Sequence, residues 1–143
     1  MINKLKRGVT VTSLVVYIVL FSSLTLFLSA TYTDLNERLF LSRGSAINYT
    51  TFNKLQYNII NSAKESNSVT IEGPYLAFSN GDKYAYDDVA KHITLADGVL
   101  CTNVDSVSVE LTPGEGCTKV TLNLKLNKYM STLEKSILVV VEE

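Results

Sequence analysis

Three successive patterns of hydrophobic and polar residues divide the chain, and each predicts a different structure. The first is a run of twenty-six uncharged residues from Gly8 to Thr33. A helix of that length would extend roughly 39 Å, whereas the hydrocarbon core of a bilayer is about 30 Å thick. Its serines and threonines can donate hydrogen bonds to carbonyls of their own helix, so they are tolerated in lipid. This pattern predicts a membrane-spanning helix over residues 9–33.

The second pattern, over residues 34–63, is amphipathic and continues the helix. Apolar residues recur mostly at spacings of three and four, as on one face of a helix. No proline precedes Pro74, so one helix can run from about Val9 to about Ala63 with Gly44 as its weak point. The alternative is two helices that are broken within residues 42–45. The apolar positions are Leu35, Leu39, Ala46, Tyr49, Phe52, Leu55, Ile59, Ile60 and Ala63.

The third pattern, over residues 64–143, is typical of an antiparallel β-sheet. Short apolar or alternating stretches are separated by turn sequences such as Gly73-Pro74, Asn80-Gly81 and Asp97-Gly98. A helix followed by a run of strands predicts the α+β class, with one small C-terminal head domain. The expected strands are 69–72, 75–78, 83–86, 92–95, 99–101, 104–111, 117–126 and 136–141.

The charges that precede the apolar run predict its orientation. Lys4, Lys6 and Arg7 come just before Gly8, and the next charged residue is Asp34. A basic head stays on the cytoplasmic side, so the rest of the chain is expected to be extracytoplasmic. The segment can be a cleaved secretory signal, a plain single-pass anchor, or a leader that ends at the glycine. The run is longer than the usual 7–15 apolar residues of a secretory signal, which weighs against the first alternative.

Residues 7–16, with the sequence RGVTVTSLVV, resemble the class III signal of type IV prepilins and type II secretion pseudopilins. The resemblance implies that residues 1–8 are a cytoplasmic leader peptide whose basic residues are Lys4, Lys6 and Arg7. It implies cleavage by a prepilin peptidase between Gly8 and Val9, followed by N-methylation of Val9. It also implies a pilin-like fold, in which a long N-terminal helix packs on an antiparallel sheet.

One position departs from this family's pattern. The family usually carries a glutamate at the fifth mature position, which is Ser13 in this chain. That carboxylate is thought to pair with the terminal amine of a neighbouring subunit, and a hydroxyl cannot form a charge-assisted bond of that strength. Some members of the family lack this glutamate, notably minor subunits at the filament tip. Ser13 therefore favours a minor subunit, a tip subunit or a divergent relative over the abundant major subunit.

The two cysteines, Cys101 and Cys117, flank the expected strand 104–111. Because export would permit it, we expect a disulfide between them, which in the chain-entropy model would contribute about 3 kcal/mol. The alternatives are two free buried thiols or, less favoured, a metal or redox role. With no CxxC motif and one histidine, the chain is not expected to bind zinc.

Catalytic and ligand-binding signals are weak. The single histidine, His92, lies in an expected strand, and we interpret it as a surface or edge residue. Asp82, Asp87 and Asp88 can be imagined as a calcium cluster but more readily mark a solvated turn. The sequence contains no nucleophile, phosphate-loop or metalloprotease motif. We therefore expect that the protein is not an enzyme and that it binds no cofactor. A basic strip of Lys119, Lys125, Lys128 and Lys135 is diluted by glutamates, and we expect no nucleic-acid partner.

The sequence therefore supports two hypotheses. The first is a minor pilin or pseudopilin, a structural subunit of a type IV pilus, competence filament or type II secretion-like machine. Its partners would be other subunits, the prepilin peptidase, the membrane assembly platform and the lipid bilayer. It would be a single-pass cytoplasmic membrane protein that later enters a surface or periplasmic filament. The second hypothesis is a membrane-anchored surface binding domain that is not part of a filament.

Overall fold

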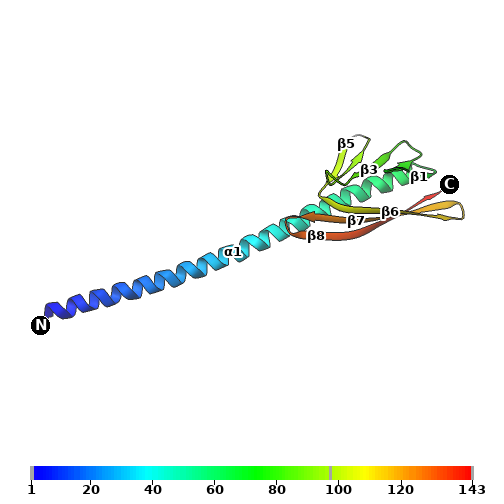
Figure 1. Ribbon diagram of the computed structural model, residues 1–143. Coiled ribbons are helices and arrows are strands. Elements are labelled where there is room, and N and C mark those ends of the chain that lie inside the picture. The colour runs from blue at the N-terminus through cyan, green and yellow to red at the C-terminus, as the bar shows by residue number, and fades with distance from the viewer. Residues whose placement is uncertain (1, 97, 143) are drawn as a thin grey trace. The chain divides into compact units, whose positions relative to one another are not determined.

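The computed structural model describes residues 2–96 and 98–142, with side chains from Thr10 onward in these ranges. The described residues form one helix, α1 (Ile2–Lys64), and eight strands (Figure 1). The α+β class is confirmed, and the helix has no break within residues 42–45. The chain divides into two compact units, residues 1–39 and residues 40–143, which we describe separately.

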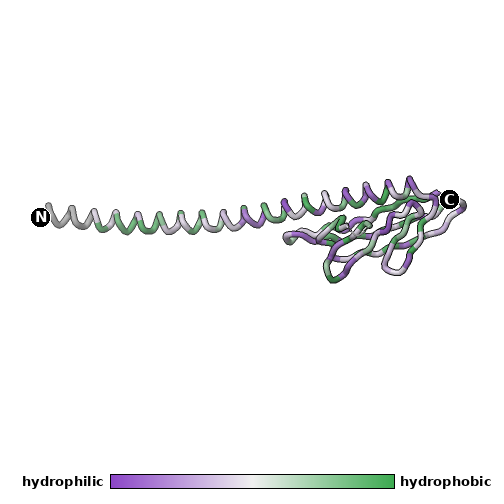
Figure 2. Tube along the Cα trace, turned by 90° about the horizontal axis from the view of Figure 1, so that it is seen from above, coloured by the Kyte–Doolittle hydropathy of each residue, from purple (hydrophilic) through white to green (hydrophobic). Residues whose placement is uncertain are grey.

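The first unit contains the apolar part of α1, whose described side chains begin at Thr10. Its described side chains are exposed all round the helix; Leu14, Phe21 and Phe27 are each more than half exposed. Figure 2 shows that much of this segment is coloured green, for hydrophobic residues. Its most apolar window has a mean hydropathy of 2.3, and the helix is long and apolar enough to cross a membrane. A helix that is apolar on every face requires an apolar environment. This property is consistent with a single membrane span or with a signal sequence.

The second unit combines the rest of α1 with two antiparallel sheets. Consecutive strands pair in both, in the orders β1-β2-β3-β4-β5 and β6-β7-β8. The first sheet contains β1 (Val69–Glu72), β2 (Tyr75–Phe78), β3 (Lys83–Asp87), β4 (His92–Leu95) and β5 (Gly98–Thr102). The second contains β6 (Val104–Gly114), β7 (Cys117–Lys128) and β8 (Ser131–Glu142).

The division into two sheets was not predicted. It occurs at Asn103, which has a φ of 64° and lies between β5 and β6. Asparagine tolerates this left-handed conformation better than most residues, so the chain can leave one sheet there and start another. Asp97, part of an expected turn, lies outside the described residues.

The hydrophobic core forms where α1 meets both sheets. Phe52, Leu55, Ile59 and Ala63 are buried at spacings of three and four, as the amphipathic pattern predicts. The burial of this face does not reach back to the start of the pattern: Leu35, Leu39, Ala46 and Tyr49 are exposed. The strands contribute Val69, Leu76, Phe78, Tyr84, Ile93, Cys101, Val104, Val120, Leu122, Leu124, Leu126, Ile137, Val139 and Val141.

Gly44 makes a close contact with the turn between β7 and β8 and is not a weak point of the helix. It is buried against the turn between β7 and β8. A Cβ atom at this position would collide with the carbonyl oxygen of Lys128 and lie 2.9 Å from Cβ of Ser131. Two hydrogen bonds fasten the same place: Ser45 Oγ lies 2.8 Å from Ser131 Oγ, and Asn48 Nδ2 donates to the Ser131 carbonyl over 2.8 Å.

Candidate functional site

Five hydroxyl groups along the apolar part of α1 donate hydrogen bonds to carbonyl oxygens of the same helix. Ser13 Oγ donates to the carbonyl oxygen of Thr10 over 3.0 Å. The same geometry recurs along the helix, three or four residues back, so these polar groups need no water or partner chain. The further bonds are Ser23 to Leu20 (2.9 Å), Thr25 to Phe21 (2.8 Å), Thr31 to Phe27 (2.9 Å) and Thr33 to Ser29 (3.0 Å).

The residues of the expected leader and cleavage site lie at the start of α1. The backbone is helical through Gly8 and Val9. The side chains of Lys4, Lys6 and Arg7 lie outside the described part of the structure. Ser13 sits in the helix four residues after Val9 with its hydroxyl turned to its own backbone, so no carboxylate is present to pair with a terminal amine.

The expected disulfide is wrong, because both cysteines are free thiols. Cys101 lies three residues before the start of β6, whereas Cys117 pairs with Gly114 at its far end. Ten steps along a strand span roughly 34 Å, and three extended residues recover at most about 11 Å. The remaining 20 Å or so far exceeds the Cα separation of about 4.4–6.8 Å that a disulfide needs. The same distance prevents the two thiols from sharing a metal or redox site.

Cys101 is held in the core instead. Its thiol donates to the carbonyl oxygen of Thr51 on α1 over 3.7 Å. Burial raises the pKa of this thiol to about 11. Since the thiolate is the reactive form, Cys101 behaves as a small core residue rather than as a nucleophile.

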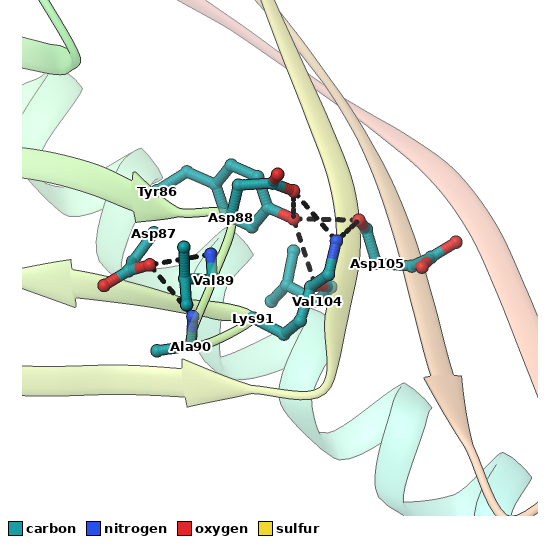
Figure 3. A network of polar contacts seen from close by, with 8 residues as sticks. All are labelled: Tyr86, Asp87, Asp88, Val89, Ala90, Lys91, Val104 and Asp105. Atoms are coloured by element: carbon teal, nitrogen blue, oxygen red, sulfur yellow. Dashed lines mark hydrogen bonds and ion pairs between the residues drawn. The ribbon is translucent and has the colours of Figure 1, made fainter.

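The acidic residues after β3 stabilise a loop (Figure 3). Asp87 Oδ1 accepts hydrogen bonds from the backbone N–H groups of Val89 (2.8 Å) and Ala90 (2.9 Å). These bonds, that of Ala90 first, lower the pKa of the Asp87 carboxyl. Asp88 forms an ion pair with Lys91 over 2.8 Å, which lowers the pKa of Asp88 and raises that of Lys91. The two carboxylates therefore have separate structural partners.

Lys91 and Tyr86 tie this loop to the start of the second sheet. Lys91 Nζ donates to the Asp105 carbonyl over 3.1 Å, and the Tyr86 hydroxyl donates to the same oxygen over 2.8 Å (Figure 3). Lys91 adopts a φ of 51°, a strained conformation for a residue with a side chain. These contacts hold the β3–β4 loop against β6.

A buried polar network that the sequence pattern did not indicate joins the end of α1 to the first sheet. Ser62 Oγ lies 2.6 Å from Asp82 Oδ2 and 2.7 Å from the hydroxyl of Tyr84. Asn80 Nδ2 donates to the same Asp82 oxygen over 2.9 Å. Burial raises the pKa of Tyr84, so the phenol stays neutral and can donate. The network satisfies polar groups that would otherwise be costly to bury.

The structure does not gather the other candidate residues into a site. His92 pairs across the sheet with Asp87, and it is partly buried. Lys125 pairs with Glu134 over 3.0 Å, whereas Lys135 lies 4.8 Å from the Tyr49 ring centroid. Within the described ranges, no three histidine, cysteine, aspartate or glutamate residues form a group that could hold a metal ion.

The described residues form one long helix and a head in which two antiparallel sheets pack on the second part of that helix. A long apolar N-terminal helix whose second part packs on antiparallel sheets is a pilin-like architecture. Comparisons of the chain with protein families, with curated proteins and with solved structures found no match.

Proposed function

We propose that this protein is a minor pilin or pseudopilin, a non-enzymatic structural subunit of a type IV pilus, competence filament or type II secretion-like filament. The observation that carries the proposal is that the two parts of α1 have different surroundings. Residues 10–33 are apolar and exposed all round, whereas Phe52, Leu55 and Ile59 of the same helix form the core of the head. Such a helix suits transfer from a bilayer into a bundle of like helices, since both surroundings are apolar.

In the proposed mechanism the subunit first waits in the cytoplasmic membrane with its head outside. The prepilin peptidase removes residues 1–8, and the new terminus on Val9 is methylated. Because the Gly8–Val9 bond lies within a helix, cleavage requires the helix to open there, and glycine favours this opening by about 1 kcal/mol relative to alanine. The assembly platform then moves the helix from lipid to neighbouring subunits.

The self-bonded hydroxyls support this transfer. Ser13, Ser23 and Thr25 keep their hydrogen-bond partner in the same helix, so these hydroxyls need not change partner when the surroundings change. Small hydroxylated residues also allow neighbouring helices to approach closely. A carboxylate at position 13 would need a partner in the filament, so Ser13 favours a minor or tip subunit.

The proposal is tested by intact mass and N-terminal sequencing of the membrane-extracted chain, produced with and without the prepilin peptidase. We expect a chain that starts at Val9 and carries one added methyl group only when the peptidase is present. A Gly8→Val variant is the matched control and should remain unprocessed.

The alternative function, a membrane-anchored surface binding domain, predicts different results. The chain would keep its residues 1–8 in the presence of the peptidase, and Gly8→Val would change its mass only by the difference between the two side chains. A start after Ala30 would instead indicate a cleaved secretory signal. Either result would refute the filament mechanism.

A further inference from the structure

The two-residue turn between β7 and β8 holds bulky residues in a backbone conformation that favours glycine. Tyr129 has a φ of 48° and Met130 a φ of 61°. Lys128 pairs with Ser131, so both residues are central positions of a tight hairpin, where Asn-Gly is preferred. The left-handed conformation costs roughly 1–2 kcal/mol for a residue with a side chain. Strain retained at two adjacent positions points to a use for these two side chains.

The strained turn displays an apolar cluster. Met130 is 76% exposed and Tyr129 47%, while Phe40 and Leu41 on α1 are 49% and 38% exposed. The rings of Phe40 and Tyr129 contact each other with centroids 6.0 Å apart. We call Phe40, Leu41, Tyr129 and Met130 the tip cluster.

Basic groups accompany the tip cluster. The ammonium group of Lys128 lies 4.9 Å from the centroid of the Tyr129 ring, and it also donates to Asn103 Oδ1 over 3.1 Å. Arg43, three residues after Phe40 on α1, is exposed. Aromatic residues together with lysine and arginine are the composition that proteins place at a membrane–water interface.

Chain connectivity keeps the tip cluster near any membrane that the apolar run enters. Phe40 follows Thr33, the last residue of the uncharged run, by seven positions. Because α1 is continuous, these seven residues rise about 10 Å along the helix axis, and less than that along the membrane normal when the helix is tilted. The headgroup region on each side of the hydrocarbon core is roughly 5–8 Å thick. The cluster is therefore tethered within reach of lipid headgroups.

We propose that the tip cluster inserts into the headgroup region of the bilayer that holds the apolar helix, with phospholipid as its partner. The inference rests on the membrane residence in the proposed function. The apolar parts of Met130, Leu41 and Phe40 enter the interface, and the Lys128 ammonium faces lipid phosphates. This contact steadies the head domain against the membrane until the helix is extracted.

Tryptophan fluorescence can test the insertion directly, because the chain contains no tryptophan. Single-tryptophan variants of the full-length protein are reconstituted in vesicles of phosphatidylcholine and phosphatidylglycerol. Met130→Trp reports on the tip cluster, and Phe21→Trp reports on the apolar run. Val89→Trp is the matched control, because Val89 is a 95% exposed residue of a different loop. Lipids brominated high on the acyl chain act as quenchers of shallow residues, and lipids brominated low on the chain act as quenchers of deep ones.

We expect shallow quenching and a blue-shifted emission for Met130→Trp, deep quenching for Phe21→Trp, and neither change for Val89→Trp. If Phe21→Trp is quenched while Met130→Trp behaves like Val89→Trp, the tip cluster does not insert, and membrane residence still stands. If Phe21→Trp is not quenched, membrane residence itself is wrong, and the inference falls with it.

A second comparison separates insertion from mere proximity. Leu41→Trp is measured with the native turn and with a turn carrying Tyr129→Asn and Met130→Gly. The Asn-Gly turn relieves the backbone strain, so the head should remain folded while it loses two of its apolar side chains. We expect shallow quenching of Leu41→Trp to fall sharply with this turn. Equal quenching with both turns would show that the turn residues do not hold the cluster in lipid.

Discussion

Replacing Gly44 by alanine should destabilise the head domain, although alanine is the better helix former. In a solvent-exposed helix this substitution is favourable by about 0.8–1 kcal/mol. Gly44 lies instead against the β7–β8 turn, where the new methyl group would collide with the carbonyl oxygen of Lys128. A backbone carbonyl cannot rotate away as a flexible side chain can, so the turn itself must move.

The size of the effect follows from the contacts that this movement would disturb. Overpacking a close contact costs about 1–3 kcal/mol. Asn48 is 1% exposed, and its amide donates to Ser131 over 2.8 Å. Leaving that buried donor unpaired costs about 1–3 kcal/mol more. After subtraction of the helix-propensity gain, we expect Gly44→Ala to lower the free energy of unfolding by about 3 kcal/mol, within a range of about 1–5 kcal/mol.

Urea unfolding of the detergent-solubilised chain, followed by near-UV circular dichroism, measures this change, because six of the eight tyrosines lie in residues 40–143. Ala46→Gly, two residues away on an exposed part of α1, is the matched control. It should lose about 1 kcal/mol through helix propensity alone. If Gly44→Ala raised the unfolding midpoint, the turn would not press on the helix at Gly44, and the close contact would be wrong.

Three further predictions concern the core, the β3–β4 loop and the thiols. Leu55→Ala, at a fully buried position of α1, should lower the free energy of unfolding by about 2–5 kcal/mol in the same urea assay, and a loss below about 1 kcal/mol would contradict the core assignment. Backbone hydrogen bonds lower the pKa of the Asp87 carboxyl in the folded state. The carboxylate therefore stabilises the loop fully at pH values above its ordinary pKa, and this stabilisation is lost as the pH falls through the lower pKa of the folded state. NMR amide shifts of the loop should therefore titrate below about pH 3.9, and a midpoint above that value would refute the capping role. In the folded protein Cys117 should react with a thiol reagent faster than Cys101, whose pKa of about 11 keeps it protonated, and mass spectrometry of the labelled peptides gives the two rates.

Much of the fold could be predicted from the sequence because its boundaries carry strong local signals. Glycine, proline, asparagine and aspartate separate most strands, so Tyr75–Phe78 and His92–Leu95 were expected with the bounds that the structure has. The absence of proline before Pro74 correctly indicated a continuous helix. The spacing of Phe52, Leu55 and Ile59 likewise predicted the buried face of α1.

What could not be predicted depends on contacts between distant residues. The turn at Tyr129 and Met130 contains no glycine, so β8 was expected to begin at Ser136, five residues after its actual start. From the sequence alone, Gly44 was expected to be a weak point of the helix, because the contact with Lys128 cannot be predicted from local sequence. The separation of Cys101 from Cys117 depends on the length of β6, which continues through Pro113 because an edge strand tolerates proline.

The position of Gly44 bears on how the proposed assembly step can proceed. The head is fastened to α1 from Gly44 onward, through Ser45, Asn48 and the core residues that follow. The uncharged run ends at Thr33. When neighbouring helices replace lipid around this run, the residues that hold the head on α1 therefore keep their own contacts. A carboxylate costs about 2.5–3.5 kcal/mol at the centre of a membrane and less towards the end of the run, where position 13 lies. With serine at position 13 this cost is absent, and so is the specific pairing that a carboxylate would supply. In the proposed filament, the axial register of the subunit would then come from helix packing and from the surface of the head.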